Sequence, residues 1–139
     1  MFDFLFKKKA QEGPSRIVNP EASNHFMDIS FEKMPVTISS EGVVVASSND
    51  VLLVREVGIR NYAPVYYLPK NSLVNAELSP CEKRTFCPLK GYASYYNLQL
   101  SERIVSESVW SYEELLSFDE RLHVFEGRIA FERQFFDIA

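Results

Sequence analysis

Short runs of β-branched and aromatic residues, separated by turn-forming residues, recur through most of the chain and constrain its fold more than any other feature. Clear examples are residues 36–39, 43–46, 65–68 and 92–100. Valine, isoleucine, threonine, tyrosine and phenylalanine favour an extended backbone, whereas glycine, proline, asparagine and serine interrupt it. The pattern therefore predicts an all-β protein, mainly β with one or two short helical turns, built as a curved, rolled antiparallel sheet or a partial barrel.

The segments between these runs are harder to assign. Residues 51–55 are an apolar run that could form a strand or a short buried helix, because periodicity cannot separate the two at this length. Residues 79–90 are predicted to form a long loop, of the kind that often carries function. Residues 111–116 are predicted to form a short helical turn, and residues 128–135 to close the sheet.

The chain has 139 residues, enough for one domain. We expect that domain to occupy residues 35–139, after an N-terminal extension and linker at residues 1–34. Within this extension, residues 17–34 could form an extended arm laid on the domain. Residues 1–9 are apolar and then basic. They are either a weak docking helix for a membrane surface or a partner, or, as we favour, a frayed end too short to hold a helix alone.

Charge and cysteine content argue against several classes of protein. The net charge is −4, so a general electrostatic affinity for nucleic acid is not expected. No apolar run approaches the ~20 residues of a membrane-spanning helix. The two cysteines, Cys81 and Cys87, and the lack of a recognisable signal peptide favour free thiols and a cytoplasmic location. The sequence does not predict an oligomeric state.

Residues 85–96 place a thiol, a proline, a lysine, a glycine and four aromatic rings in one short segment. Pro88 fixes its own φ and lacks a backbone N–H, and Gly91 permits a positive φ or a close backbone approach. Lys90 lies between them on a predicted tight turn, and an alternating aromatic strand follows. Such a turn would present the lysine from a rigid base, which makes this segment the first candidate for function.

The same segment resembles the signature of domain-of-unknown-function family 427, a group of small bacterial domains that also carries a nucleotidyltransferase-like label. The matching residues are Thr85, Cys87, Pro88, Lys90, Gly91, Ala93 and Tyr95, with further matches at residues 65–69, 109–112 and 127–131. The resemblance covers residues 36–131. It implies a compact, mainly β fold with a curved sheet, an acidic residue at Glu56, and a binding role for Lys90 as an alternative to an ordinary surface lysine.

The candidate ligand-binding residues are Lys90, Tyr67, Tyr112, Cys87, Glu56, Gly91 and Trp110. A lysine on a glycine-flanked loop can meet an anion as a point charge, and Gly91 would let the loop approach the ligand. Tyr67 and Tyr112 could edge a pocket that stacks on a planar ligand. Trp110 could wall the same pocket, although a core position explains it better.

Cys87 and Glu56 each allow two interpretations. Cys87 could be a nucleophile, but the histidines available as a base, His25 and His123, are far away in sequence, and a buried thiol is the default use of a single cysteine. Glu56 could form a buried ion pair or act as a general acid or base. Two cysteines and two unmatched histidines fall short of a four-ligand zinc pattern, so no metal site is predicted.

Three functions follow from these residues. The first is a small-molecule binding domain for an anionic or planar ligand, with Lys90, Tyr67 and Tyr112 in a common pocket. The first alternative is a nucleotidyltransferase-like enzyme, which needs convergent carboxylates to hold Mg²⁺. The pairs Glu113–Glu114 and Asp119–Glu120 are chain neighbours that point to opposite faces of a strand. The second alternative is a protein-interaction module acting through residues 1–16. No cofactor is identified.

Overall fold

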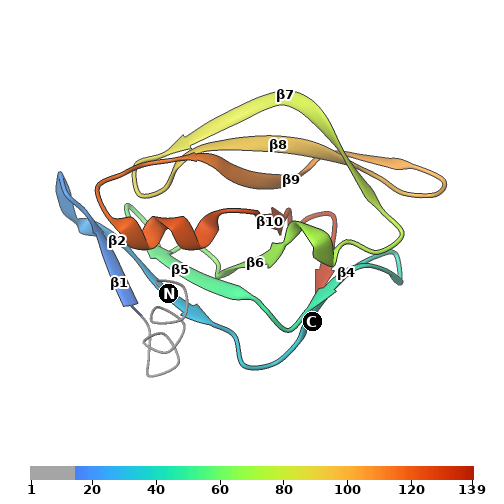
Figure 1. The fold of residues 1–139 in the computed structure, drawn as a ribbon, viewed down its shortest axis with the longest axis horizontal. Coiled ribbons are helices and arrows are strands. Elements are labelled where there is room, and N and C mark those ends of the chain that lie inside the picture. Colours follow the sequence, from blue (N-terminus) through green and yellow to red (C-terminus); the bar gives the residue numbers. More distant parts are fainter. Residues whose placement is uncertain (1–14) are drawn as a thin grey trace.

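The computed structural model describes residues 15–139 (Figure 1). The docking helix or frayed end expected at residues 1–9 lies outside the described residues. The described chain contains the strands β1 (Ser15–Asn19), β2 (Ala22–Phe31), β3 (Val36–Ser40), β4 (Val43–Ser48), β5 (Leu52–Val57), β6 (Val65–Pro69), β7 (Glu77–Cys87), β8 (Gly91–Gln99), β9 (Ile104–Leu115), β10 (Arg128–Phe131) and β11 (Asp137–Ile138), and the 3₁₀ helices η1 (Lys70–Ser72) and η2 (Glu120–Phe125).

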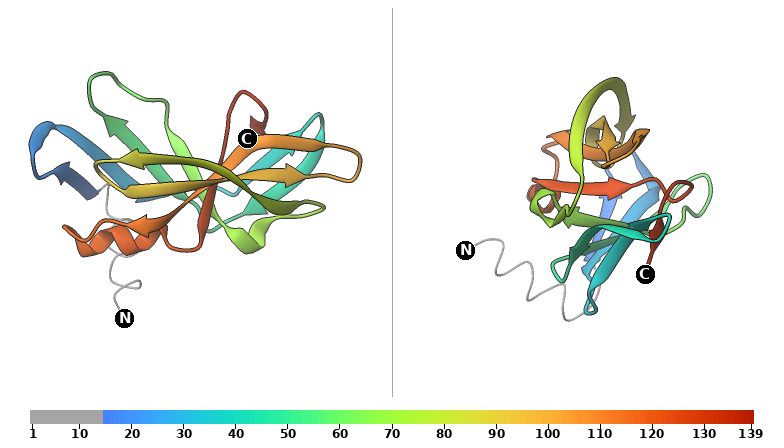
Figure 2. Two further views of the ribbon diagram at one scale, coloured as in Figure 1. Left: turned by 90° about the horizontal axis from the view of Figure 1, so that it is seen from above. Right: turned by 90° about the vertical axis from the view of Figure 1, so that its right-hand side faces the viewer.

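Eight strands form one antiparallel sheet in the order β1-β2-β5-β6-β10-β9-β8-β7, and β11, β3 and β4 form a smaller one. The larger sheet folds over itself. An upper leaf of β7, β8 and β9 lies above a lower leaf of β1, β2, β5 and β6, with β10 joining them (Figures 1 and 2). Within the described residues β1 and β7 remain the two edges, so the sheet is not closed into a barrel. The predicted mainly β fold with a rolled antiparallel sheet is confirmed.

The core consists of two clusters of buried apolar side chains. One includes Tyr67, Leu89 and Phe125, and the other includes Leu68 and Phe131. Leu89 belongs to the turn between β7 and β8 and is fully buried. The candidate turn is therefore anchored in the first cluster by its own apolar residue.

Residues 17–34, which we expected as an extended arm laid on the domain, lie mostly in β1 and β2 of the larger sheet. β1 pairs with β2, and β2 pairs with β5 along six residues. Ile17, Met27 and Ile29 are fully buried in the first core cluster. The other face of these strands carries Val18 and Phe26 beside polar side chains, which is why the alternation of apolar and polar residues is weak in the sequence.

Adjacent residues of β1 give a direct test of this placement. Ile17→Ala should lower the free energy of unfolding by about 2–5 kcal/mol, because Ile17 is fully buried. Val18→Ala should change it by about 0.5 kcal/mol or less, because the Val18 side chain is exposed on the opposite face. Urea denaturation of both variants measures the difference. Equal effects would mean that β1 does not pack on the core in solution.

Two other local predictions are wrong. Most of the long loop expected at residues 79–90 is strand β7; it lies at the sheet edge, where polar side chains and Pro80 are tolerated. The helical turn expected at residues 111–116 is a continuation of β9, which pairs with β8 at Ala93 and Tyr112. The ambiguous apolar run at residues 51–55 lies mostly in strand β5.

Within residues 15–139, none of the helices has the length and apolar character needed to cross a membrane. Cys81 and Cys87 are both free and partly buried.

Candidate functional site

The turn between β7 and β8 holds two of the candidate side chains close together. The Lys90 backbone N–H donates to the Cys87 carbonyl at 3.1 Å, which closes a four-residue turn with Pro88 at its second position. The Lys90 ammonium donates to the Cys87 sulfur at 3.5 Å. The turn thus sets a thiol and an ammonium side by side.

Gly91 is required because strand β9 lies very close to it, whereas we expected it to let the turn approach a ligand. Its φ is +130°, and a Cβ placed on it would lie 2.1 Å from the Glu114 carbonyl oxygen of β9. Any side chain would collide with backbone at that distance. Gly91 therefore permits the close approach of β8 to β9, and this contact, rather than a ligand, explains the glycine.

Lys90 is almost completely buried and is paired with Glu56 of β5. Lys90 Nζ lies 2.7 Å from Glu56 Oε1, and the two side chains are 4% and 18% exposed. Burial alone would lower the pKa of Lys90, but the acidic groups around it, Tyr67, Tyr112, Cys87 and Glu56, raise it above its ordinary value. Lys90 is therefore a permanent cation in the folded protein, which excludes it as a general base near neutral pH.

Glu56 also bonds His25, a partner that the sequence did not indicate. His25 Nε2 lies 2.9 Å from Glu56 Oε2, and His25 Nδ1 lies 3.2 Å from the Asn19 side-chain nitrogen. Burial acts to raise the pKa of Glu56, but the Lys90 charge and the bonds from His25 and Lys90 outweigh it and lower that pKa. A continuous polar chain thus runs from Asn19 through His25, Glu56 and Lys90 to Cys87.

Two tyrosines complete the site. The Lys90 ammonium lies 5.3 Å from the centre of the Tyr112 ring, and the Tyr112 and Tyr67 rings are 6.3 Å apart. Burial raises the pKa of both phenols. The Tyr67 hydroxyl accepts a hydrogen bond from Trp110 Nε1 at 3.4 Å, whereas the Tyr112 hydroxyl makes no hydrogen bond to the described residues. We call Glu56, Tyr67, Cys87, Lys90 and Tyr112 the Lys90 cluster.

Trp110 lies outside this cluster and contacts it through Tyr67. Its ring packs edge-on to Tyr67 at 6.4 Å and lies 5.9 Å from Tyr95. It also lines a separate cleft of about 170 Å³ together with Tyr66 and Phe131. Trp110 therefore orients the Tyr67 hydroxyl and does not itself touch Lys90 in the described contacts.

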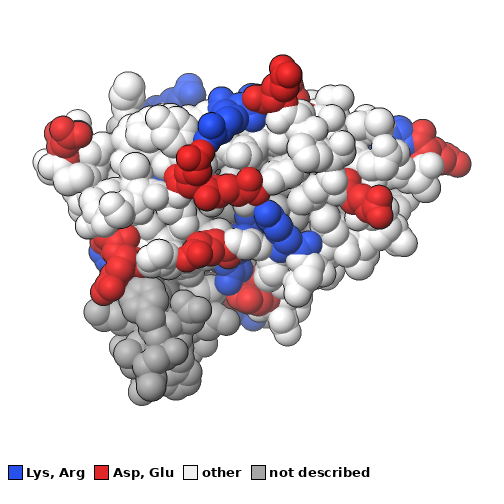
Figure 3. Space-filling model, turned by 45° about the horizontal axis from the view of Figure 1, so that its top comes forward, with Lys and Arg blue, Asp and Glu red and all other residues white. Residues whose placement is uncertain are grey.

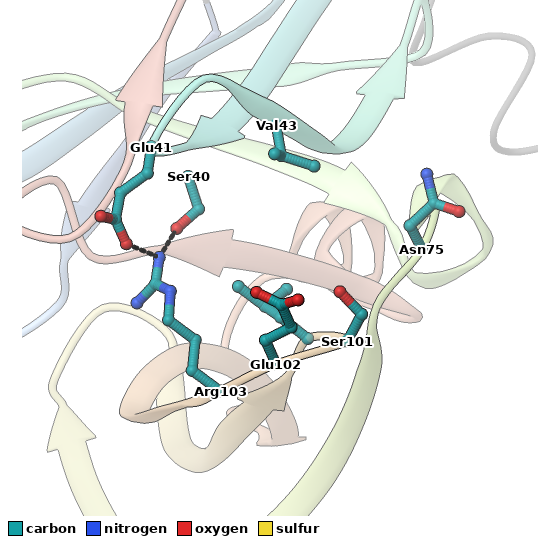
Figure 4. Close-up of a pocket in the computed structure, with 8 residues that line it drawn as sticks. Ser40, Glu41, Val43, Asn75, Ser101, Glu102 and Arg103 are labelled. Carbon is teal, nitrogen blue, oxygen red and sulfur yellow. Dashed lines mark hydrogen bonds and ion pairs between the residues drawn. The ribbon is translucent and has the colours of Figure 1, made fainter.

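A larger cleft, of about 440 Å³, lies where three turns meet and contains none of the candidate residues. It is lined by Ser40, Glu41, Val43, Asn75, Leu100, Ser101, Glu102 and Arg103. Figure 4 shows the Arg103 guanidinium bonded to Glu41 and Ser40. Its ion pair is 41% and 77% exposed, whereas that of Lys90 and Glu56 is 4% and 18% exposed, so the Lys90 cluster remains the stronger candidate despite the size of this cleft.

Among residues 15–139, no group of three or more histidine, cysteine or acidic side chains could hold a metal ion. Glu113 bonds Lys70 and Tyr96, and burial together with this carboxylate raises the pKa of Tyr96 to about 12. Glu114 bonds Arg84 instead. The two neighbouring carboxylates therefore serve separate partners.

The pKa shifts predict how stability depends on pH. Because the pKa of Glu56 is lowered from its ordinary 4.5, its contribution to the stability of the fold should be complete above pH 4.5. That contribution should decline as pH falls through the lowered pKa. Because the pKa of Lys90 is raised from its ordinary 10.5, its contribution to stability should be complete below pH 10.5 and decline only as pH rises through the raised value. Urea midpoints at neutral and acidic pH should show a smaller acid-induced loss in a Glu56→Gln, Lys90→Met double variant than in the wild type. Identical losses would contradict this assignment.

A family model described as a domain of unknown function, DUF427, matches residues 28–139. A comparison with curated proteins gave no match. The matched region contains every member of the Lys90 cluster, but it begins after Asn19 and His25.

Proposed function

We propose that this chain, which belongs to the DUF427 family, binds a small, planar, uncharged ligand at the exposed side of the Lys90 cluster. The observation that carries this proposal is the burial of the Lys90 ammonium. A buried ion pair adds little stability compared with apolar side chains of the same volume. Shifted pKa values also concentrate at functional sites. A lysine, a carboxylate, a thiol and two phenols gathered at one end of a hydrophobic core therefore favour a chemical use.

The hydrogen-bonding capacity left in the cluster indicates what the ligand should contain. Lys90 Nζ has three protons, of which Glu56 and Cys87 take two. The Tyr112 hydroxyl is free to donate, as the described contacts leave it without a partner. Two donors on adjacent groups suit a carbonyl oxygen, and the Tyr112 ring offers a surface for a planar body.

An anionic ligand, the other chemistry considered from the sequence, has weaker support. Glu56 already balances the charge of Lys90, so an anion would meet a neutral site and would also face the carboxylate. Nucleotidyl transfer has no supporting observation, since it depends on a metal-holding carboxylate group. A protein-interaction role through residues 1–16 rests largely on residues outside the described part.

Location and macromolecular partners stay predictions. Two free thiols fit the reducing cytoplasm. On the face seen in Figure 3, basic and acidic side chains are interspersed, which fits the expectation that the protein does not bind nucleic acid. The oligomeric state remains unassigned.

A titration followed by ¹⁵N–¹H NMR tests the proposal. Benzamide and nicotinamide serve as planar carbonyl probes, and phosphate and acetate serve as anions. We expect the planar probes to shift the amides of Cys87, Lys90 and Tyr112. Tyr112→Phe should weaken their binding about fivefold through loss of one hydrogen bond. Tyr96→Phe is the matched control, because the Tyr96 hydroxyl bonds Glu113 and its ring packs on the second core cluster. Shifts with the anions alone, or with no probe, would overturn the proposal.

A further inference from the structure

We infer that Cys87 is a nucleophile that takes an acyl group from a small planar ester or thioester bound at the Lys90 cluster. This inference rests on the proposed function, because the same donors that would hold a carbonyl ligand would hold the reacting carbonyl. It adds a reaction, a substrate class and a role for the thiol.

The position of Lys90 relative to the sulfur is the geometric basis. Nζ and Sγ are 3.5 Å apart, so a carbonyl carbon attacked by Sγ would have its oxygen within hydrogen-bonding reach of the ammonium. Lys90 is 3% exposed and is held by Glu56, and this fixed, water-excluded cation is where electrostatic stabilisation of an oxyanion is most effective. Cys87 itself is only partly buried, and we place the substrate on this partly exposed side of the cluster.

The other groups of the cluster have distinct roles in this step. The Tyr112 ring lies beside the Lys90 ammonium, 5.3 Å from Nζ to the ring centre, and in this proposal its hydroxyl donates a second hydrogen bond to the developing oxyanion. Glu56 acts through Lys90 and is a positioning residue, and His25 holds the other oxygen of that carboxylate. Lys90 stays protonated throughout, so it stabilises charge and does not carry the proton.

The chemistry balances without an oxidant or a metal. The bond from Sγ to the carbonyl carbon forms, and the bond from that carbon to the leaving oxygen or sulfur breaks. The thiol proton passes through solvent on the open side of Cys87 to the leaving group. The products are an S-acyl Cys87 and a free alcohol or thiol.

Acylation of the intact protein by p-nitrophenyl acetate tests the inference, with Cys81 as an internal control thiol on the same strand. At neutral pH, peptide mass spectrometry should find Cys87 acetylated at least about tenfold faster than Cys81. Tyr112→Phe should reduce the Cys87 rate several-fold, and Lys90→Met should reduce it to that of Cys81. In denaturant the two cysteines should react at similar rates, which separates an effect of the fold from one of local sequence.

The acylation experiment can fail while the proposed ligand binding holds. Cys87→Ser should abolish acylation at this position and still bind benzamide, because the hydrogen-bond donors remain. Benzamide binding combined with equal acylation of Cys87 and Cys81 would overturn the nucleophilic role alone. A Cys87 rate that is unchanged in Tyr112→Phe and Lys90→Met would overturn it as well. Tyr112→Phe removes a single hydroxyl and should fold, so its acylation rate decides the test if Lys90→Met fails to fold.

Discussion

Glu56→Gln should lower the free energy of unfolding by about 3–5 kcal/mol, because it leaves the Lys90 ammonium buried without its counter-charge. Urea denaturation at neutral pH measures the loss. The matched control is Glu113→Gln. Glu113 pairs with Lys70 in a much more exposed setting, where an ion pair contributes about 0–1 kcal/mol.

The partner substitutions decide whether the ion pair stabilises the fold or serves another purpose. Lys90→Met should be milder than Glu56→Gln, because Glu56 keeps His25 and is more exposed than Lys90. The Glu56→Gln, Lys90→Met double variant should recover most of the lost stability, since no unpaired charge remains. Losses that simply add in the double variant would contradict this account and would also weaken the argument that the cluster is retained for function.

Gly91→Ala should destabilise the protein by about 3 kcal/mol or more, since an added Cβ combines a collision with strand β9 and a strained positive φ. Thermal unfolding followed by circular dichroism measures the shift. Gly42→Ala is the control: Gly42 also has a positive φ, but a Cβ there meets nothing within 4 Å. It should lose only about 1–2 kcal/mol. A tolerated Gly91→Ala would return that glycine to a role in ligand access.

The fold class and the turn could be predicted because local chemistry determines both. Pro88 and Gly91 bracket a turn wherever they fall in the sheet, and Cys87 and Lys90 are three residues apart, so the turn itself brings them together. The strand at residues 79–87 was missed because an edge strand buries little, and its run of charged side chains resembles a loop. Residues 111–115 have the composition of a helical turn, but pairing with β8 overrides it.

The part of the site that the sequence could not indicate is the part made by pairing of distant strands. Glu56 reaches Lys90 across the core from β5, and His25 reaches Glu56 from β2. No local pattern encodes either contact. The sequence of residues 15–31 does not indicate paired strands, because Val18 and Phe26 interrupt the alternation of apolar and polar residues, and it offers His25 only as a distant base for Cys87. Paired strands, not sequence spacing, place His25 in the polar chain.

The position of β10 has a consequence for biosynthesis. Each leaf of the sheet is built largely from strands near one another in the chain, but the two leaves are joined through β10, whose four residues are all buried. Those residues leave the ribosome after the other seven strands of the larger sheet. Until they emerge, the nascent chain can form its hairpins but lacks the strand that pairs with both leaves. Truncation before Arg128 should therefore yield aggregation-prone chains, and a chaperone that shields such faces would act until β10 has emerged.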